Sequence, residues 1–533
     1  MPRQNHTHEE GRTTHGGMEY TRSTDITTSD VSSRLLHRFY EPLGLLSALG
    51  QARGEHTHTT QPSLRHIDSL THEQVRRQFL DELAFLCDYK KGGDSCTAIA
   101  LGQNPQGYVF WVAANKCPER LIIPFLQNLL EILKKADGTR DSQLLIGEVL
   151  RISITFARER LKTYALHLLS KLEKLKIFPA CTNEPIYGFI AIWENRLENL
   201  DGDDLHSLVE YAYTSRHSDF MHQLATLAHE QRYKASGDSL QATCASVRHQ
   251  IGRLGLHARS AIALASFMHR MMPFMESYSV RAVHIPVEGK GRPAPRKATN
   301  LDSALNRMLP QDTPDREVYQ PALAQMDKLF NISERFLSDY SDSKHRTRVH
   351  AEVQVLHHFD EHDEEFAGGD KYIACSKPAC FCCHLYFRHH PGGFFEPRSH
   401  QKIYLNWQPP LMESARPGKE HQLRDILNLM TKDIRKDALD QLRKQAAPRG
   451  YHPDSITGIS LSTIATPGLD AISIAANDER EKDALVDADS EYSSLESDNA
   501  TASSSSTSLL DMDSDTDEEE GGISLLGLDQ ALG

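Results

Sequence analysis

The chain has 533 residues, of which 39% are hydrophobic and 25% charged, and its formal net charge at pH 7 is −14. This length allows two to four domains, and no apolar run approaches the roughly 18 residues that would span a bilayer. The first residues lack the apolar segment of a secretory signal. We therefore expect a cytoplasmic or nuclear protein with reduced thiols and no membrane partner.

The negative charge is concentrated at the C-terminal end. Residues 478–533 hold 17 acidic side chains against Arg480 and Lys482, a net charge of −15, which leaves +1 for the rest of the chain. The rest therefore lacks the strongly basic character of a typical nucleic-acid binder. The composition of residues 453–533 predicts a disordered, acidic, Ser-rich tail. The run ISLLGL beside the acidic block is a candidate docking motif for a protein partner, with a plain solvated tail as the alternative.

Residues 1–62 are rich in Thr, Ser, His and Gly, which predicts a mostly disordered N-terminal tail. Regular structure is expected to begin near Leu70 with an amphipathic helix. Thr71 is a candidate N-cap for this helix. Four apolar side chains follow it at helical spacing: Val75, Phe79, Leu83 and Leu86.

A β-hairpin is predicted after this helix. The apolar runs 97–101 and 108–113 are joined by GQNPQG, whose Gly, Asn and Pro residues favour a tight turn. Residues 63–117 are therefore assigned to the first part of an α/β domain.

The next segment, residues 118–345, is dominated by helical periodicity. It shows no fixed repeat, so packed helices are predicted and not a solenoid. The Pro- and Gly-broken basic stretch 289–297 is interpreted as a solvated linker, with phosphate contact as the alternative. Two further helices are expected at residues 319–337 and 421–444.

Residues 346–452 contain the side chains with the clearest chemistry. His350-Ala351-Glu352 opens an apparent helix, residues 371–374 form a short β-type run, and the sequence SKPACFCC then leads into a second helix. Four of the nine cysteines lie between Cys375 and Cys383. In a reducing compartment such a cluster indicates metal or redox chemistry.

This pattern suits a catalytic zinc ion, which takes three protein ligands and keeps one position for water. His350 and the C-x-x-C pair Cys380 and Cys383 supply three ligands, and the second helix begins at the cysteines. A helix N-terminus lowers the pKa of a thiol and so favours thiolate. Glu352 lies two residues from His350, close enough to accept a proton without binding the metal.

The H-x-E and C-x-x-C motifs resemble those of the zinc-dependent cytidine deaminase superfamily. HAEVQVL with YIACSKPACFCC is similar to a fungal group of deaminase-like proteins, the nucleic acid or nucleotide deaminases, and so are the upstream FLDELAFLCDYKKGGDSCTAIAL and WVAANK. The resemblance implies that His350, Cys380 and Cys383 hold Zn²⁺ and that Glu352 transfers protons. In one departure from the superfamily pattern, Ala379 separates Pro378 from Cys380.

Three further residues are candidates for substrate binding. In the deaminase fold a β-hairpin precedes the H-x-E helix, often with an Asn that contacts substrate. If the hairpin 97–113 has this place, then residues 118–345 are an insertion and Asn115 lies beside the metal. Arg348 is a candidate phosphate contact, and Ser376 of the SKPAC motif is the third candidate.

The predicted fold is α/β: a cytidine-deaminase-like mixed sheet covered by helices, with a large all-helical insertion and disordered termini. The sheet is expected to include residues 97–101, 108–113, 371–374 and 402–406. The predicted function is zinc-dependent hydrolytic deamination of cytosine or adenine in a nucleotide or nucleic acid. The alternative is a catalytically inactive zinc protein of the same fold that serves as a binding or scaffold module. Redox chemistry at C-x-x-C is disfavoured because no thioredoxin-like pattern surrounds it.

Overall fold

The structure, a computed structural model, describes residues 25–50, 56, 69–116, 118–135, 142–181, 184–198, 203–229, 239–283, 293, 299–310, 313–341, 347–410, 418–445 and 453–455. The chain forms two compact units. The helical unit comprises Met1–Gln51, Lys290–Thr347 and Leu411–Pro448. The α/β unit comprises Ala52–Gly289, Arg348–Pro410 and Arg449–Gly533. The acidic block and the docking motif expected in the C-terminal tail lie outside the described residues.

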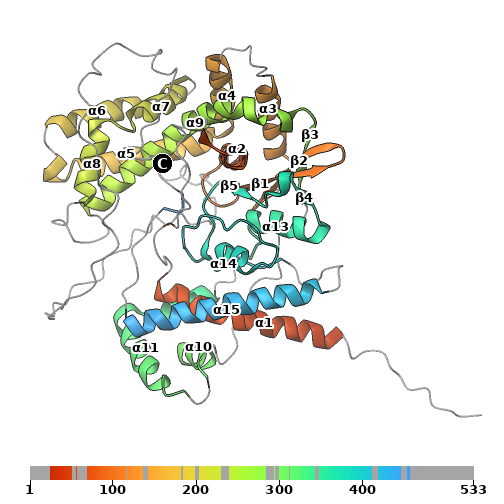
Figure 1. Ribbon diagram of the computed structural model, residues 1–533. Helices are drawn as coiled ribbons and strands as arrows, with labels where there is room; N and C mark the ends of the chain where they lie inside the picture. Colours follow the sequence, from red (N-terminus) through yellow and green to blue (C-terminus); the bar gives the residue numbers. More distant parts are fainter. Residues whose placement is uncertain are drawn as a thin grey trace, which may run out of the picture. The chain divides into compact units, whose positions relative to one another are not determined.

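A five-stranded mixed sheet organises the α/β unit (Figure 1). Its strands are β1 (Thr97–Asn104), β2 (Gly107–Ala114), β3 (Tyr278–Ala282), β4 (Glu365–Phe366) and β5 (Ala374–Cys375). The order is β3-β2-β1-β4, and β5 also pairs with β1. Strands β2 and β3 are parallel, and the other pairs are antiparallel. The predicted hairpin is confirmed as β1 and β2, and the α/β fold class is confirmed with it.

The other predicted strands require correction. Only Ala374 of the run 371–374 belongs to a strand, and residues 402–406 form none. The chain turns there, because the Trp407 N–H donates to the Tyr404 carbonyl at 3.2 Å. Lone backbone hydrogen bonds replace a ladder: the Lys402 carbonyl accepts from Phe381 at 2.9 Å, and the Asn406 carbonyl accepts from Arg348 at 2.8 Å. The segment therefore bonds to Arg348 and Phe381, which lie just before the start of one helix and at the start of another.

Three helices of the α/β unit support the site described below. Helix α2 (His72–Cys87) packs on β1 and β5, α13 (Ala351–His362) packs on β1 and β2, and α14 (Phe381–His389) packs on α13. Thr71 caps α2 as predicted: its side chain accepts from the Gln74 N–H, and the Gln74 side chain accepts from the Thr71 N–H. This reciprocal capping box fixes where α2 begins.

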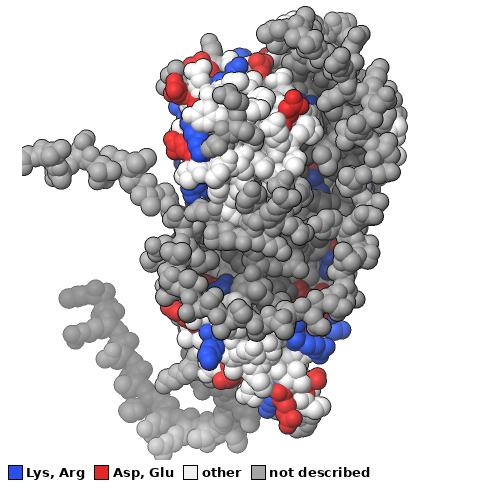
Figure 2. All heavy atoms as spheres, turned by 90° about the vertical axis from the view of Figure 1, so that its left-hand side faces the viewer, with Lys and Arg blue, Asp and Glu red and all other residues white. Residues whose placement is uncertain are grey.

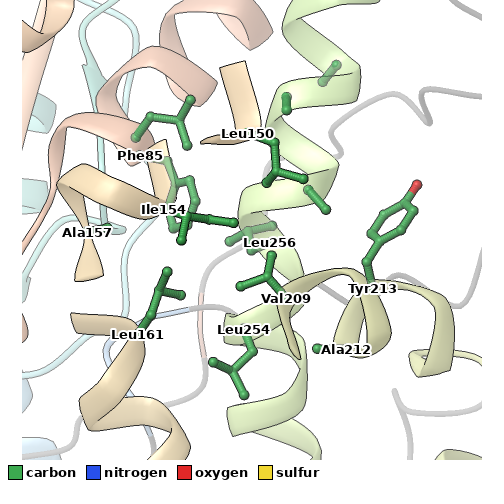
Figure 3. Packing of buried hydrophobic residues seen from close by; sticks show 14 of the residues in the cluster. Phe85, Leu150, Ile154, Ala157, Leu161, Val209, Ala212, Tyr213, Leu254 and Leu256 are labelled. Atoms are coloured by element: carbon green, nitrogen blue, oxygen red, sulfur yellow. The ribbon is translucent and has the colours of Figure 1, made fainter. Parts of the chain in front are cut away.

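The segment between β2 and β3 is helical, as its periodicity predicts. It forms α3 (Ile122–Lys134), α4 (Ser142–Phe156), α5 (Arg158–Leu175), α6 (Glu184–Leu197), α7 (Asp203–Ser215), α8 (Asp219–His229) and α9 (Leu240–Met275). Helix α9 contacts α2, α4, α5, α7 and α8. Figure 3 shows the buried side chains that join these helices, among them Leu150, Leu161, Val209 and Leu256. A Cβ atom at Gly255 would lie 2.9 Å from the Tyr213 Cα, so glycine permits the close approach of α7 and α9.

A buried ion pair ties α5 to the loop of residues 88–96, which connects α2 to β1. The Arg160 Nη2 lies 2.9 Å from the Asp88 Oδ2, and both side chains are 0% exposed. The Arg160 Nε donates to the Tyr164 hydroxyl at 2.9 Å, and Ser95 donates to the other Asp88 oxygen at 2.6 Å. A buried charge pair depends on such additional hydrogen bonds. The insertion helices are thereby fastened to the loop that supports the site described below.

The helical unit contains α1 (Asp25–Leu49), α10 (Leu301–Met308), α11 (Arg316–Phe330), α12 (Ile332–Ser341) and α15 (Lys419–Lys444). Helix α1 packs along α15 and contacts α10 and α12, and α11 also contacts α15. The helix predicted at residues 421–444 is confirmed as α15. The one predicted at residues 319–337 is two helices, because Asn331 adopts a left-handed conformation with φ of +50°.

Helix α1 lies within residues 1–62, where the composition predicts disorder. The Thr, Ser and His content of the whole segment masks an apolar stripe at helical spacing, formed by Leu35, Phe39, Leu43 and Leu46, all of which are buried. The residues of the predicted insertion 118–345 also divide between the two units at Gly289 and Lys290. Within the described residues, no helix is long and apolar enough to cross a membrane.

Candidate metal centre

The three predicted ligands converge at the starts of two helices. His350 is the N-cap residue of α13, and Cys380 is the N-cap residue of α14. The His350 Nδ1 lies 3.5 Å from the Cys380 Sγ and 3.4 Å from the Cys383 Sγ. All three side chains are buried, and their donor atoms lie within 4.8 Å of one another. One imidazole nitrogen and two sulfurs at this spacing form a donor set suited to a metal ion.

Asn115 supplies the helix cap that His350 does not provide. The His350 side chain makes no capping hydrogen bond because it faces the two cysteines. Instead, the Ala351 N–H donates to the Asn115 Oδ1 at 2.9 Å, and the Asn115 Nδ2 donates to the Gly93 carbonyl at 2.8 Å. The Gln354 side chain also donates to the Ala114 carbonyl at 3.1 Å. The hairpin therefore ends beside His350, as expected if residues 118–345 are inserted between the hairpin and the H-x-E helix.

Replacing Asn115 by Ala is expected to lower the free energy of unfolding by about 1–2 kcal/mol, because a cap is lost and buried polar groups lose their partner. We also expect metal affinity to fall roughly tenfold, as is typical when a group that orients a ligand is removed. Urea denaturation and competition with a chelator measure the two effects. Asn104→Ala, in the turn at the other end of the hairpin, is the matched control. Equal metal affinity in both variants would contradict the capping role.

The two sulfurs receive hydrogen bonds that favour thiolate. The Cys383 N–H donates to the Cys380 Sγ at 3.5 Å, and the Trp407 Nε1 donates to the Cys383 Sγ at 3.2 Å. Burial raises the pKa of the Cys380 thiol, but the hydrogen bond from Cys383 and the positive charge of His350 lower it to about 6. Burial and the neighbouring sulfur raise the pKa of Cys383. The pair therefore holds one thiolate near neutral pH before any metal adds its own charge.

This donor chemistry fits zinc. A nitrogen and two sulfurs are the ligand set that one class of catalytic zinc sites uses, with the fourth position left for water or substrate. The indole N–H of fully buried Trp407 is an outer partner of the kind that orients metal ligands. Trp407 was not predicted from the sequence, because its spacing from the cysteines carries no signal that identifies it.

Glu352 lies in the first turn of α13, two residues after His350, and is 4% exposed. Its Oε2 accepts from the Cys375 Sγ at 3.9 Å. The Cys375 Sγ lies 3.7 Å from the Cys96 Sγ on the adjoining strand edge. Glu352 is thus a buried carboxylate beside the donor set, bordered by half-buried Cys375.

The loop of residues 88–96 positions Asn115 through Gly93 and Arg348 through Asp94. Arg348 donates to the Asp94 carboxylate at 2.9 Å, and Lys116 forms an ion pair with the same side chain. Ser376 accepts from the Thr97 N–H at 3.1 Å. Asn115, Arg348 and Ser376 therefore all lie at the site's edge with bonds to protein groups, and their assignment to substrate binding stays a prediction.

The same loop contains two glycines, Gly92 and Gly93, whose carbonyls accept hydrogen bonds from residues at the site. Gly92 has a φ of +103°, a conformation that favours glycine, and its carbonyl accepts from the Lys377 Nζ at 2.8 Å. The Gly93 carbonyl accepts from Asn115. The GGD sequence between a predicted helix and a predicted strand was the available signal for this role.

Comparison with known proteins found one similarity, which covers part of the chain. No curated protein and no solved structure matches the chain. Residues 349–411, the segment that holds His350, Glu352, Cys380 and Cys383, match the model of the OTT_1508-like deaminase family. The candidate metal centre therefore lies in a segment that is similar to a deaminase domain.

Proposed function

We propose that this protein is a zinc-dependent hydrolytic deaminase that acts on cytosine or adenine in a nucleotide or nucleic acid. One observation carries the proposal: the buried nitrogen and two sulfurs of His350, Cys380 and Cys383 meet beside Glu352, within a segment that matches a deaminase family. A metal site alone would serve many functions. A buried carboxylate two residues from the histidine ligand is what hydrolytic deamination adds to it.

Zinc, when bound, supplies Lewis acidity that lowers the pKa of a water molecule towards about 7. His350, Cys380 and Cys383 would hold the ion. Glu352 would take a proton from water at its carboxylate and deliver it to the ring nitrogen next to the amino-bearing carbon, C4 of cytosine or C6 of adenine. A second proton transfer through the same carboxylate completes the loss of ammonia, so that water replaces the amino group by a carbonyl oxygen.

The charge distribution favours a substrate with few phosphate contacts. On the face shown in Figure 2, basic and acidic side chains of the described residues lie near one another, and neither sign covers a broad area. Extended duplex binding draws on many phosphate contacts. A free nucleotide or a short single-stranded segment, which offers fewer phosphates, suits the near-neutral charge of residues 1–477 better.

The second candidate function is a zinc module without catalysis. The exposed fractions of His350, Glu352 and Cys380 are 6%, 4% and 2%, so little of the centre is open to solvent. A centre closed to bases would keep its metal for structure alone.

A substrate panel separates the two candidates. Zinc-loaded protein is incubated with nucleosides and nucleotides of cytosine and adenine and with single-stranded RNA and DNA, and ammonia release and product mass are measured. Deamination by the wild type that is lost in Glu352→Gln and in Cys380→Ala supports the enzyme. Zinc-loaded wild type that deaminates no member of the panel favours the non-catalytic module.

A further inference from the structure

The helical unit contains a cavity of about 620 Å³ that is open to solvent at the surface and is lined by residues of α1, α10, α11 and α15. Sites for small molecules commonly measure about 300–1,000 Å³. Met308 and Tyr319, which are both buried, contribute to the wall. The cavity is thus large enough for a ligand of about nucleotide size, and part of its wall is apolar.

The charged residues that line this cavity are four cations and one anion: Arg38, Lys432, Arg435, Lys436 and Asp440. In the part of the chain that the structure describes, none of the four cations makes an ion pair or a side-chain hydrogen bond. Two other cations of the same unit are paired: the Arg307 Nε lies 2.6 Å from the Glu41 carboxylate, and Arg443 donates to the Tyr319 hydroxyl at 2.5 Å. Arg316 and Arg424, like Arg435, have a buried Nε without a partner among the described residues. The cavity therefore has an excess of positive over negative side chains, and Arg38, Lys432 and Lys436 among them are exposed.

Arg435 combines a buried hydrogen-bond donor without an acceptor and a like charge nearby. Its Nε is buried and has no acceptor among the described residues. Burial and the nearby Arg38 guanidinium lower its pKa, and Glu41 offsets this only in part. Two guanidinium groups that lie near each other repel each other, and a buried donor without an acceptor is costly. An anion in the cavity would relieve both penalties.

We propose that this cavity binds a phosphate ester, with Arg38 and Arg435 on the phosphate oxygens and Lys432 and Lys436 as additional charges. The planar guanidinium presents paired N–H donors that match phosphate geometry, and lysine supplies a point charge. This assignment is independent of the deaminase proposal, because every residue in it belongs to the helical unit. Two sources share the chemistry: a free nucleotide and the backbone of a single-stranded nucleic acid.

Calorimetric titration of the full chain tests the proposal with four probes: inorganic phosphate, a nucleoside monophosphate, the same nucleoside without phosphate, and a short single-stranded oligonucleotide. Arg435→Gln and Lys432→Gln are compared with Lys444→Gln, which removes the same charge from α15 outside the cavity. Lys432 and Lys444 are exposed, so neither lysine variant threatens folding. We expect each cavity variant to weaken phosphate-dependent binding by at least about tenfold, and the control to leave it within about twofold.

Each outcome decides the proposal. Binding of the monophosphate that exceeds that of the nucleoside, and that falls in the cavity variants alone, supports a nucleotide site. Binding of the oligonucleotide alone, with the same variant pattern, supports the phosphate chemistry and assigns it to a nucleic-acid backbone. Equal losses in the cavity variants and in Lys444→Gln, or no phosphate-dependent binding, would overturn the proposal, because general surface charge would then explain the data.

Discussion

Replacing Glu352 by Gln is expected to lower the rate of base deamination by about 10²–10⁴-fold, the usual contribution of a positioned general acid–base group. The amide keeps the size of the side chain but cannot carry a proton between water and the base. Glu352 is not among the three donor residues, so the variant should keep the zinc content of the wild type. Initial rates and zinc content are measured on the same preparations, with the substrate that the panel identifies.

Glu361→Gln provides the matched control, since Glu361 lies near the other end of the same helix. Its rate is expected to stay within about twofold of the wild type, as is usual for a surface substitution away from such a site. A Glu352→Gln variant that turns over at the wild-type rate would remove Glu352 from the proton-transfer role.

Replacing Arg160 by Met should produce the largest loss of stability, about 3–5 kcal/mol in the free energy of unfolding. The substitution leaves the Asp88 carboxylate charged at 0% exposure and removes the hydrogen bond to Tyr164. It also loosens the loop of residues 88–96, whose Gly93 and Asp94 hold Asn115 and Arg348. Urea denaturation followed by circular dichroism measures the change.

A partly exposed ion pair of the same unit gives the comparison. Lys176 and Glu194 lie 2.6 Å apart with side chains 34% and 20% exposed, and Lys176→Met should cost less than about 1 kcal/mol. Similar losses for Arg160→Met and Lys176→Met would show that burial does not set the value of the Arg160 pair.

The parts of the site that the sequence predicted depend on local spacing. His350 and Glu352 share one helical turn, and the C-x-x-C spacing places Cys380 and Cys383 at the start of the next helix. The hairpin was recognisable because two apolar runs flank a turn sequence. Each of these features is set within a few residues, where periodicity and turn chemistry act directly.

The parts that the sequence did not predict depend on contacts between distant residues. Asn115 caps a helix that begins 236 residues later, and Arg160 pairs with a carboxylate 72 residues earlier. Strand β3 is defined by its parallel pairing with β2. Residues 402–406 have the composition of a strand but bond singly to two other segments. Neither the composition of a segment nor the spacing of its residues indicates which distant residues it will contact.

The most direct test of the central claim is zinc stoichiometry by elemental analysis of the purified wild type, Glu352→Ala and Cys380→Ala. We predict one zinc per chain in the wild type, retained in Glu352→Ala and lost in Cys380→Ala, because only the second substitution removes a ligand. A wild-type protein that holds no zinc after expression with added metal would contradict the account and leave an interaction module as the better explanation.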